Sequence, residues 1–287
     1  MAAAYRTRTL HHDSALGRWT LTTYRPCAEL AADVAEMWEV EGVQAYRRDQ
    51  VLPCGDVIVL FNLGQPQYLV EPDHQTAFRT AWVSGLQQRS LITEAHAGSH
   101  LIGLRLTPPG ARRLMRLDMH ELTNAVVPLD AVVGPAAAAL LDRLRNAAGR
   151  STRFALLEQA LLARLRTAPA VDPVVGWAWR SLLASHGRAR IAELADDIGC
   201  SRKHLAGRFR DTVGMAPKPF ARLLKFARVI DLIETGRPVD LPDLAQACGY
   251  YDQAHFNREF RAFSGSTPGA YLRQRLPDAG GGFALAD

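Results

Sequence analysis

Two short stretches in the last third of the chain place polar and basic side chains at the spacing of one helix face. These side chains are Arg202, Lys203 and Arg210 in the first stretch, and Gln253, Asn257, Arg258 and Arg261 in the second. Arg, Lys, Asn and Gln hydrogen-bond to base edges and to phosphates, so a helix that exposes them is suited to the major groove of DNA. The residue types therefore predict nucleic-acid recognition.

The two stretches are copies of one pattern. The chain reads "ELADDIGCSRKHLAGRFRDTVG" over 193–214 and "DLAQACGYYDQAHFNREFRAFSG" over 243–265, with an offset of fifty residues before the turn and fifty-one after it. Each copy has a short apolar helix, a turn glycine (Gly199 or Gly249) that permits positive φ, and a second helix. This pattern predicts two helix-turn-helix units.

Local signals position the second helix of each unit. Ser201 and Asp252 stand where an N-cap belongs, because their side-chain oxygens can accept from the free N–H groups of the first turn. Apolar pairs four residues apart pin each second helix to its own unit; they are Leu205 with Phe209, and Phe256 with Phe260. The residues between these pairs therefore face outward.

The lines "GCSRKHLAGRFRDTVGMAPKPFARLLKFARVIDLI" and "ACGYYDQAHFNREFRAFSGSTPGAYLRQR" resemble the AraC/XylS-type DNA-binding domain over residues 173–275. The resemblance implies helix-turn-helix units at 191–212 and 242–263, joined by a long helix, with recognition helices that enter major-groove segments about one turn (~34 Å) apart. The DNA-binding residues that we expect are Ser201, Arg202, Lys203, Ala206, Gly207 and Arg210 in the first unit, and Gln253, Ala254, His255, Asn257, Arg258 and Arg261 in the second.

The first recognition helix departs from its relatives at Gly207, where they often carry an arginine. Glycine cannot contact a base and costs about 1 kcal/mol in a helix relative to alanine. We therefore expect Arg258 and Asn257 to supply the strongest readout, and the first unit to depend on Lys203 and Arg202. We expect Arg208 to reach either a phosphate or an acid within the protein.

Composition and charge agree with this division of the chain. The 287 residues carry a net charge of +5, with 48% hydrophobic and 22% charged residues, which is typical of a globular protein. Residues 174–276 hold 16 Lys/Arg against 10 Asp/Glu, whereas residues 1–173 hold 18 against 17, so the positive charge is concentrated in the repeat region. We expect neither a signal peptide nor a membrane span, and hence a cytoplasmic protein.

The sequence of the first half predicts mostly strands, unlike the helical second half. The expected fold class is therefore α+β with two domains. Short apolar runs bounded by Gly and Pro predict strands; these runs are "RWTLTTY", "DVIVLFNLG", "QYLVEP", "AWVSGL" and "SHLIGLRL". We expect "AELAADVAEMWEV" to form a helical insert between them. The expected order is a β-rich sensor domain (1–134), an amphipathic helix pair (135–166), a linker (167–173), the DNA-binding domain (173–275) and a disordered tail (277–287).

The stretches "RDQVLPCGDVIVLFNLG" and "GLRLTPPGARRLM" resemble the cupin-like sensor domain of some AraC-type regulators. The resemblance implies a small-molecule effector, with an unassigned binding site. The leucines of 135–166 are consistent either with an intramolecular core or with a dimer seam. We expect His96 and His100 to be surface histidines and not a metal site. We expect Cys27 and Cys54 to be small buried residues and not a redox pair.

The function that these observations favour is a sequence-specific transcription regulator, either an activator or a repressor, and not an enzyme. Its expected partners are double-stranded promoter DNA, a small-molecule effector, RNA polymerase and a second copy of the chain, with no cofactor and no metal. The alternative is a DNA-targeted enzyme such as an alkyl-transfer repair protein, which would need an activated cysteine or a four-cysteine metal site. The four scattered cysteines provide no such metal site. An architectural DNA protein would leave the β domain without a role.

Overall fold

The computed structural model describes residues 7–14, 17–43, 46–236, 240–274 and 283–284. The strands are β1 (Thr7–Ser14), β2 (Gly17–Tyr24), β3 (Val34–Val43), β4 (Tyr46–Val51), β5 (Val57–Asn62), β6 (Gln67–Val70), β7 (Gln75–Phe78), β8 (Ala81–Ser84), β9 (Leu91–His96), β10 (His100–Leu106), β11 (Val126–Pro128) and β12 (Phe283–Ala284). Short 3₁₀ helices are η1 (Ala28–Leu30) and η2 (Met119–Leu122). The α-helices are α1 (Pro108–Met115), α2 (Leu129–Val133), α3 (Ala136–Arg145), α4 (Arg150–Leu165), α5 (Pro173–Ala184), α6 (Ile191–Ile198), α7 (Arg202–Val213), α8 (Pro217–Glu234), α9 (Leu241–Ala247), α10 (Gln253–Ser264) and α11 (Pro268–Gln274).

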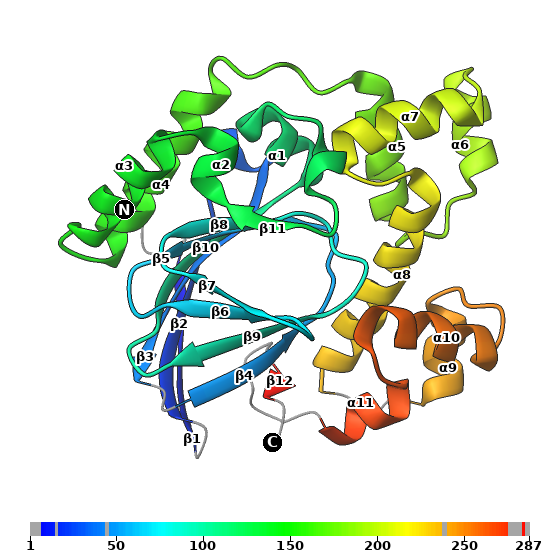
Figure 1. Cartoon of the computed structure of the whole chain (residues 1–287). Coiled ribbons are helices and arrows are strands. Elements are labelled where there is room, and N and C mark those ends of the chain that lie inside the picture. The colour runs from blue at the N-terminus through cyan, green and yellow to red at the C-terminus, as the bar shows by residue number, and fades with distance from the viewer. Residues whose placement is uncertain (1–6, 15–16, 44–45, 237–239, 275–282, 285–287) are drawn as a thin grey trace.

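The N-terminal half contains two antiparallel sheets. The larger has the order β1-β2-β3-β10-β5-β8-β11, and the smaller has the order β12-β4-β9-β6-β7. Side chains alternate along β5, so Val59 and Phe61 pack toward the helices while Leu60 packs with Trp82 and Leu69 between the sheets. The larger sheet is thus covered on one face by the smaller sheet and on the other by α1–α4 (Figure 1).

The five apolar runs expected to be strands are confirmed as β2, β5, β6, β8 and β10. The expected helical insert is wrong beyond the single turn of η1, because the following residues form β3. This strand pairs with both β2 and β10, and Met37 and Glu39 are buried while Ala35 and Glu41 are exposed. Pairing on both sides therefore overrides the helix propensity of this alanine- and glutamate-rich segment.

Glu39 of β3 ties the larger sheet to α4. Its carboxylate is fully buried and lies 2.6 Å from His100 Nε2 and 2.5 Å from Arg153 Nη2, with Arg150 Nε at 3.4 Å. Burial alone would raise the pKa of Glu39, but the hydrogen bonds from His100 and Arg153 outweigh it and hold that pKa below its usual value. The charges across this interface fix the position of α4 on the sheet.

The C-terminal domain is helical and is organised around α8. Phe220 and Phe226 of α8 are fully buried and contact Phe209 of α7 and Phe260 of α10, respectively. The same apolar cluster continues into the sheet and helices of the first half, where it includes Met119 of η2. The described residues of the two halves therefore share one hydrophobic core.

Two further expectations concern the helix pair and the tail. Helices α3 and α4 occupy most of 135–166, and Leu141, Leu144 and Leu157 are buried in the shared core, as the intramolecular interpretation requires. Phe283–Ala284, expected to be disordered, pair with β4 as β12, and the rest of 277–287 lies outside the described residues. None of the helices in the described part of the chain is both long and apolar enough to cross a membrane.

Candidate nucleic-acid interface

The repeat forms two helix-turn-helix units. The first consists of α6 and α7 and the second of α9 and α10, so the expected spans 191–212 and 242–263 agree with the helices to within one residue at each end. Gly199 and Gly249 have φ of 72° and 74°, which is the left-handed conformation that the turn requires. The two units lie at opposite ends of α8 (Figure 1).

Side-chain caps start both recognition helices. Ser201 Oγ accepts a hydrogen bond from the backbone N–H of His204 at 3.2 Å, and Asp252 Oδ1 accepts one from the N–H of His255 at 2.6 Å. The two caps satisfy donors of the first helical turn, and the Asp252 carboxylate also complements the positive end of the helix dipole. Ser201 therefore serves as the N-cap of α7.

The expected outer faces are accessible. The exposed members are Ser201, Arg202, Lys203, Gly207 and Arg210 of the first unit, and Gln253, Ala254, Arg258 and Arg261 of the second. Three others, Ala206, His255 and Asn257, are half-buried. Among the described residues no carboxylate pairs with Arg202, Lys203, Arg258 or Arg261, so these four charges are available to an anionic partner.

His255 and Gly207 differ from the other members of the set. The His255 ring packs edge-on against Tyr250 with 5.6 Å between ring centroids, which holds it close to the protein. A Cβ added at Gly207 would meet no atom within 4 Å, so this position is an open gap on the surface of α7. Side chains that project from α7 toward a partner therefore come from the turns on either side of Gly207.

Several basic residues of the domain hold the fold together. Arg208 forms an ion pair with Asp172, the N-cap of α5, so of the two partners expected for it the internal acid is present. Arg222 of α8 forms a two-pronged ion pair with Glu259 of α10 at 2.6 and 2.9 Å, which fixes the second recognition helix on α8. The number of basic residues in the sequence of this domain therefore overstates the number of positive charges that are available to a ligand.

Tyr251 is a surface residue that the sequence reasoning missed. It lies in the turn before α10, and 92% of its surface is exposed, beside the outer face of the second unit. A tyrosine at such a place is able to contact both a sugar and a phosphate. Its place directly before the cap residue Asp252 was the available signal.

The C-terminal ends of both recognition helices contact the N-terminal domain. At the end of α7, Arg112 Nε donates to the Asp211 carbonyl at 3.2 Å and Thr123 Oγ1 donates to the Gly214 carbonyl at 2.6 Å. These two contacts attach the first unit to α1 and η2.

The second unit has its own attachment. At the end of α10, Gln50 Nε2 donates to the Ser264 carbonyl at 2.6 Å and Ser90 N donates to the Phe263 carbonyl at 2.8 Å. The N-terminal end of α7, with Arg202 and Lys203, and the outer face of α10, with Arg258 and Arg261, remain exposed.

Three of the four cysteines have the properties of unreactive thiols. All four are free, and burial raises the pKa of Cys54 to about 11, with the Asp56 carboxylate adding to the shift. Burial also raises the pKa of Cys27 and of Cys248. The thiolate is the nucleophilic form, so these three residues are poorly suited to attack at neutral pH.

Two groups of potential metal ligands are better explained as ion-pair networks. His100 is half-buried against Glu39, so the surface interpretation holds for the exposed His96 and is wrong for His100. Glu39, Glu41 and His100 form the first group, and Arg150 pairs with both of its carboxylates. Asp118, His120 and Asp211 form a second group, but Arg112 lies 3.0 Å from Asp118 and already supplies its positive charge.

Comparison with known protein families gives two matches that divide the chain. Residues 194–274 match a family described as a helix-turn-helix domain, and residues 22–128 match a domain of unknown function, DUF6597. The chain is 30% identical over 103 residues to an AraC-like transcription regulator of Streptomyces lividans. That match covers 36% of this chain and 34% of the relative, so the chain spans about a third of the length of this curated protein.

Solved structures with a similar arrangement include ToxT of Vibrio cholerae and the AraC-like transcriptional activator CuxR. ToxT aligns with a TM-score of 0.45 and 12% identity, over 83% of this chain and 96% of ToxT. CuxR aligns with a TM-score of 0.33 and 13% identity, over 79% of this chain and 85% of CuxR.

Proposed function

We propose that this chain is a sequence-specific DNA-binding transcription regulator of the AraC type whose N-terminal domain responds to a small-molecule effector. The match of residues 194–274 to a helix-turn-helix domain and the similarity to an AraC-like regulator support this proposal. The observation that carries the proposal is the pair of recognition helices on α8, each with basic side chains on its exposed outer face: Arg202 and Lys203 on α7, and Arg258 and Arg261 on α10. Two such helices can occupy successive major-groove segments on one face of the duplex.

The roles of the residues follow from exposure and chemistry. Arg258 and Asn257 read bases, because arginine pairs with guanine and asparagine with adenine in two-pronged geometry. Lys203 and Arg202 supply the contacts of the first unit. The other members of the DNA-binding set position the duplex; they are Ser201, Ala206, Gly207, Arg210, Gln253, Ala254, His255 and Arg261.

The enzymatic alternative requires an activated cysteine, and the chemistry of the thiols does not favour it. An alkyl acceptor needs thiolate character, whereas burial and Asp56 raise the pKa of Cys54 to about 11. We therefore propose a regulator without catalytic activity. As a transcription factor it would act in the cytoplasm, with RNA polymerase as a partner at the promoter and a second copy of the chain on paired sites.

Selection of genomic fragments with the full-length protein, followed by footprinting of the recovered sites, tests this function. We expect a protected site with two half-elements about one helical turn apart. Arg190→Ala provides a matched control, since Arg190 is an exposed arginine paired with Glu193 outside the recognition helices. Recovery of random fragments, or a footprint unaffected by combined loss of Lys203 and Arg258, would contradict the proposal.

A further inference from the structure

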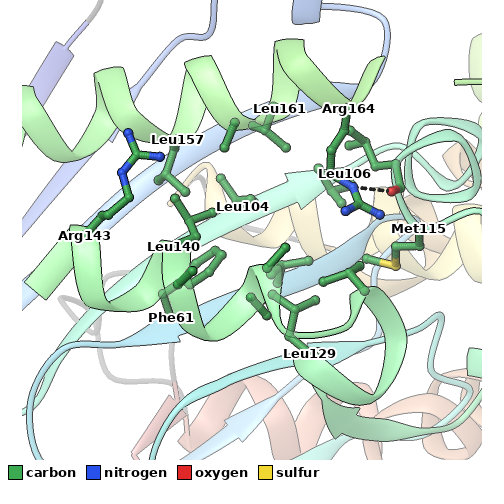
Figure 2. A pocket seen from close by; sticks show the side chains of 17 residues that line it. Phe61, Leu104, Leu106, Met115, Leu129, Leu140, Arg143, Leu157, Leu161 and Arg164 are labelled. Carbon is green, nitrogen blue, oxygen red and sulfur yellow. Dashed lines mark hydrogen bonds between the residues drawn. The ribbon is translucent and has the colours of Figure 1, made fainter. Parts of the chain in front are cut away.

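A cavity of about 320 Å³ lies between the larger sheet and helices α1–α4. Its floor includes Leu104 of β10, and its walls include Met115 of α1, Leu140 of α3 and Leu157 of α4 (Figure 2). The size lies at the lower end of the range for small-molecule sites, about 300–1,000 Å³. The apolar walls predict that an occupant buries a hydrocarbon body here.

Arginines lie at opposite ends of this cavity, as Figure 2 shows for Arg143 and Arg164. Arg164 is half-buried, and its Nε donates to the Leu114 carbonyl at 2.8 Å. Among the described residues, no carboxylate pairs with the Arg164 guanidinium. Its charge is therefore held at the edge of an apolar space without a counter-ion from these residues.

The electrostatics around Arg164 are those of an anion-binding site. Burial lowers the pKa of Arg164, and the nearby positive charge of Arg116 lowers it further. Arg116 itself donates to the Thr167 carbonyl, so the fold retains both positive charges at this end of the cavity. A bound anion would offset their repulsion and accept the N–H groups that Arg164 does not use for Leu114.

We propose that this cavity binds a small amphiphile with an apolar body and one carboxylate, the body against the leucine-lined walls and the carboxylate on Arg164. The proposal rests on the proposed function, because it assigns a site and a ligand class to the effector of the regulator. An amine would face two arginines, and a neutral alcohol would leave the charge of Arg164 without a counter-ion. The selectivity for a carboxylate follows from these charges.

The cavity also has a direct connection to the first recognition helix. Leu114 and Met115 of α1 line it, and Arg112 of the same helix donates to the Asp211 carbonyl of α7. An occupant that moves α1 changes the geometry of this hydrogen bond. The site can therefore alter DNA binding through one short helix, without a change in the second unit.

The test is calorimetric binding of three probes with the same apolar body to the full-length protein: 4-phenylbutyrate, 4-phenylbutanol and 4-phenylbutylamine. We expect the carboxylate to bind at least tenfold more tightly than the alcohol and the amine. Arg164→Gln should weaken the carboxylate about 10- to 100-fold, the value of a hydrogen bond to a charged group, and leave the alcohol within twofold. Equal binding of the three probes, or no binding, would overturn the proposal.

Matched variants distinguish a ligand contact from a folding defect. Arg164→Lys keeps the charge and should retain the carboxylate preference, whereas Arg166→Gln removes an exposed arginine outside the cavity and should change nothing. Ala160→Phe fills the cavity and should abolish binding of all probes while circular dichroism remains unchanged. Probe binding that survives in Ala160→Phe would place the ligand elsewhere and overturn the assignment.

Operator binding is measured separately, so the two proposals fail independently. A saturating carboxylate should change the operator Kd of the natural chain by at least threefold and that of Arg164→Gln by less than that. Probe binding with no effect on the operator Kd would overturn the connection through α1. Specific DNA binding with no probe binding would overturn the cavity assignment and leave the regulator function intact.

Discussion

The two helix-turn-helix units share a scaffold but rest on different parts of the N-terminal domain. The first unit is held at the end of α7 by Arg112 of α1 and by Thr123, which follows η2. The second unit is held at the end of α10 by Gln50 of β4 and by Ser90, which precedes β9. One attachment belongs to a helix that lines the proposed effector cavity, and the other belongs to the smaller sheet.

The outer faces of the two recognition helices also differ in the side chains that they carry. The first recognition helix has an open gap at Gly207, whereas the second presents Arg258 and Asn257. We infer that the second unit contributes most of the sequence discrimination and that the first contributes most of the response to the effector. Duplication of a motif thus allows one copy to be adjusted by a ligand while the other keeps its register on DNA.

The largest expected effect tests what the units have in common. Phe209→Ala and Phe260→Ala should each lower the free energy of unfolding by about 3–5 kcal/mol, because each ring is fully buried in an equivalent position. Urea denaturation of the two variants measures this. A difference above about 2 kcal/mol between them would contradict an equal structural role for the two units.

Arg258→Ala tests the assignment of base readout to the second unit. It should weaken binding to the selected operator by about 1–3 kcal/mol and relax the preference at one base pair. Lys203→Ala should weaken binding to all sequences more evenly, because a lysine on a phosphate carries no base information. Titrations at one fixed salt concentration compare the two, and unchanged preference in Arg258→Ala would contradict the assignment.

Arg112→Gln tests whether the two attachments have different functions. It removes the hydrogen bond to Asp211, at a cost of about 0.5–1.5 kcal/mol of stability, together with the ion pair to Asp118, and should reduce the effect of 4-phenylbutyrate on the operator Kd. Gln50→Ala removes the corresponding contact of the second unit and should retain the response to the probe. Equal loss of response in both variants would show that the attachments act together.

Gly207→Ala has the smallest expected effect and sharpens the contrast between the outer faces. An added methyl group meets open space, so the helix should gain about 0.5–1 kcal/mol in stability. Operator affinity should remain within twofold, since neither side chain reaches a base. Thermal denaturation and a DNA titration measure the two quantities, and a loss of affinity would indicate close approach of the duplex at this position.

The residues that the sequence could predict are those fixed by local spacing. The caps Ser201 and Asp252, the turn glycines and the buried phenylalanines all lie within a few residues of the helices that they organise. The sequence also predicted that Arg208 would meet either an acid or a phosphate, and the structure places it on Asp172.

The features that the sequence could not predict depend on long-range pairing. Arg112 and Asp211, for example, are 99 residues apart. The sequence around β3 favours a helix, and only the neighbouring strands make it extended. The cavity has the same origin, because its lining comes from two strands of the larger sheet and four separate helices that no local pattern connects.

The hydrophobic core that runs from the sheets into both helix-turn-helix units has a consequence for genetics. Because one apolar cluster of the described residues spans both halves, we expect the halves to unfold together, so that damage in either half lowers the folded population. A loss of regulation caused by a substitution near the cavity is therefore ambiguous unless protein abundance is measured as well. Selection on this gene acts on the folded fraction of the whole chain.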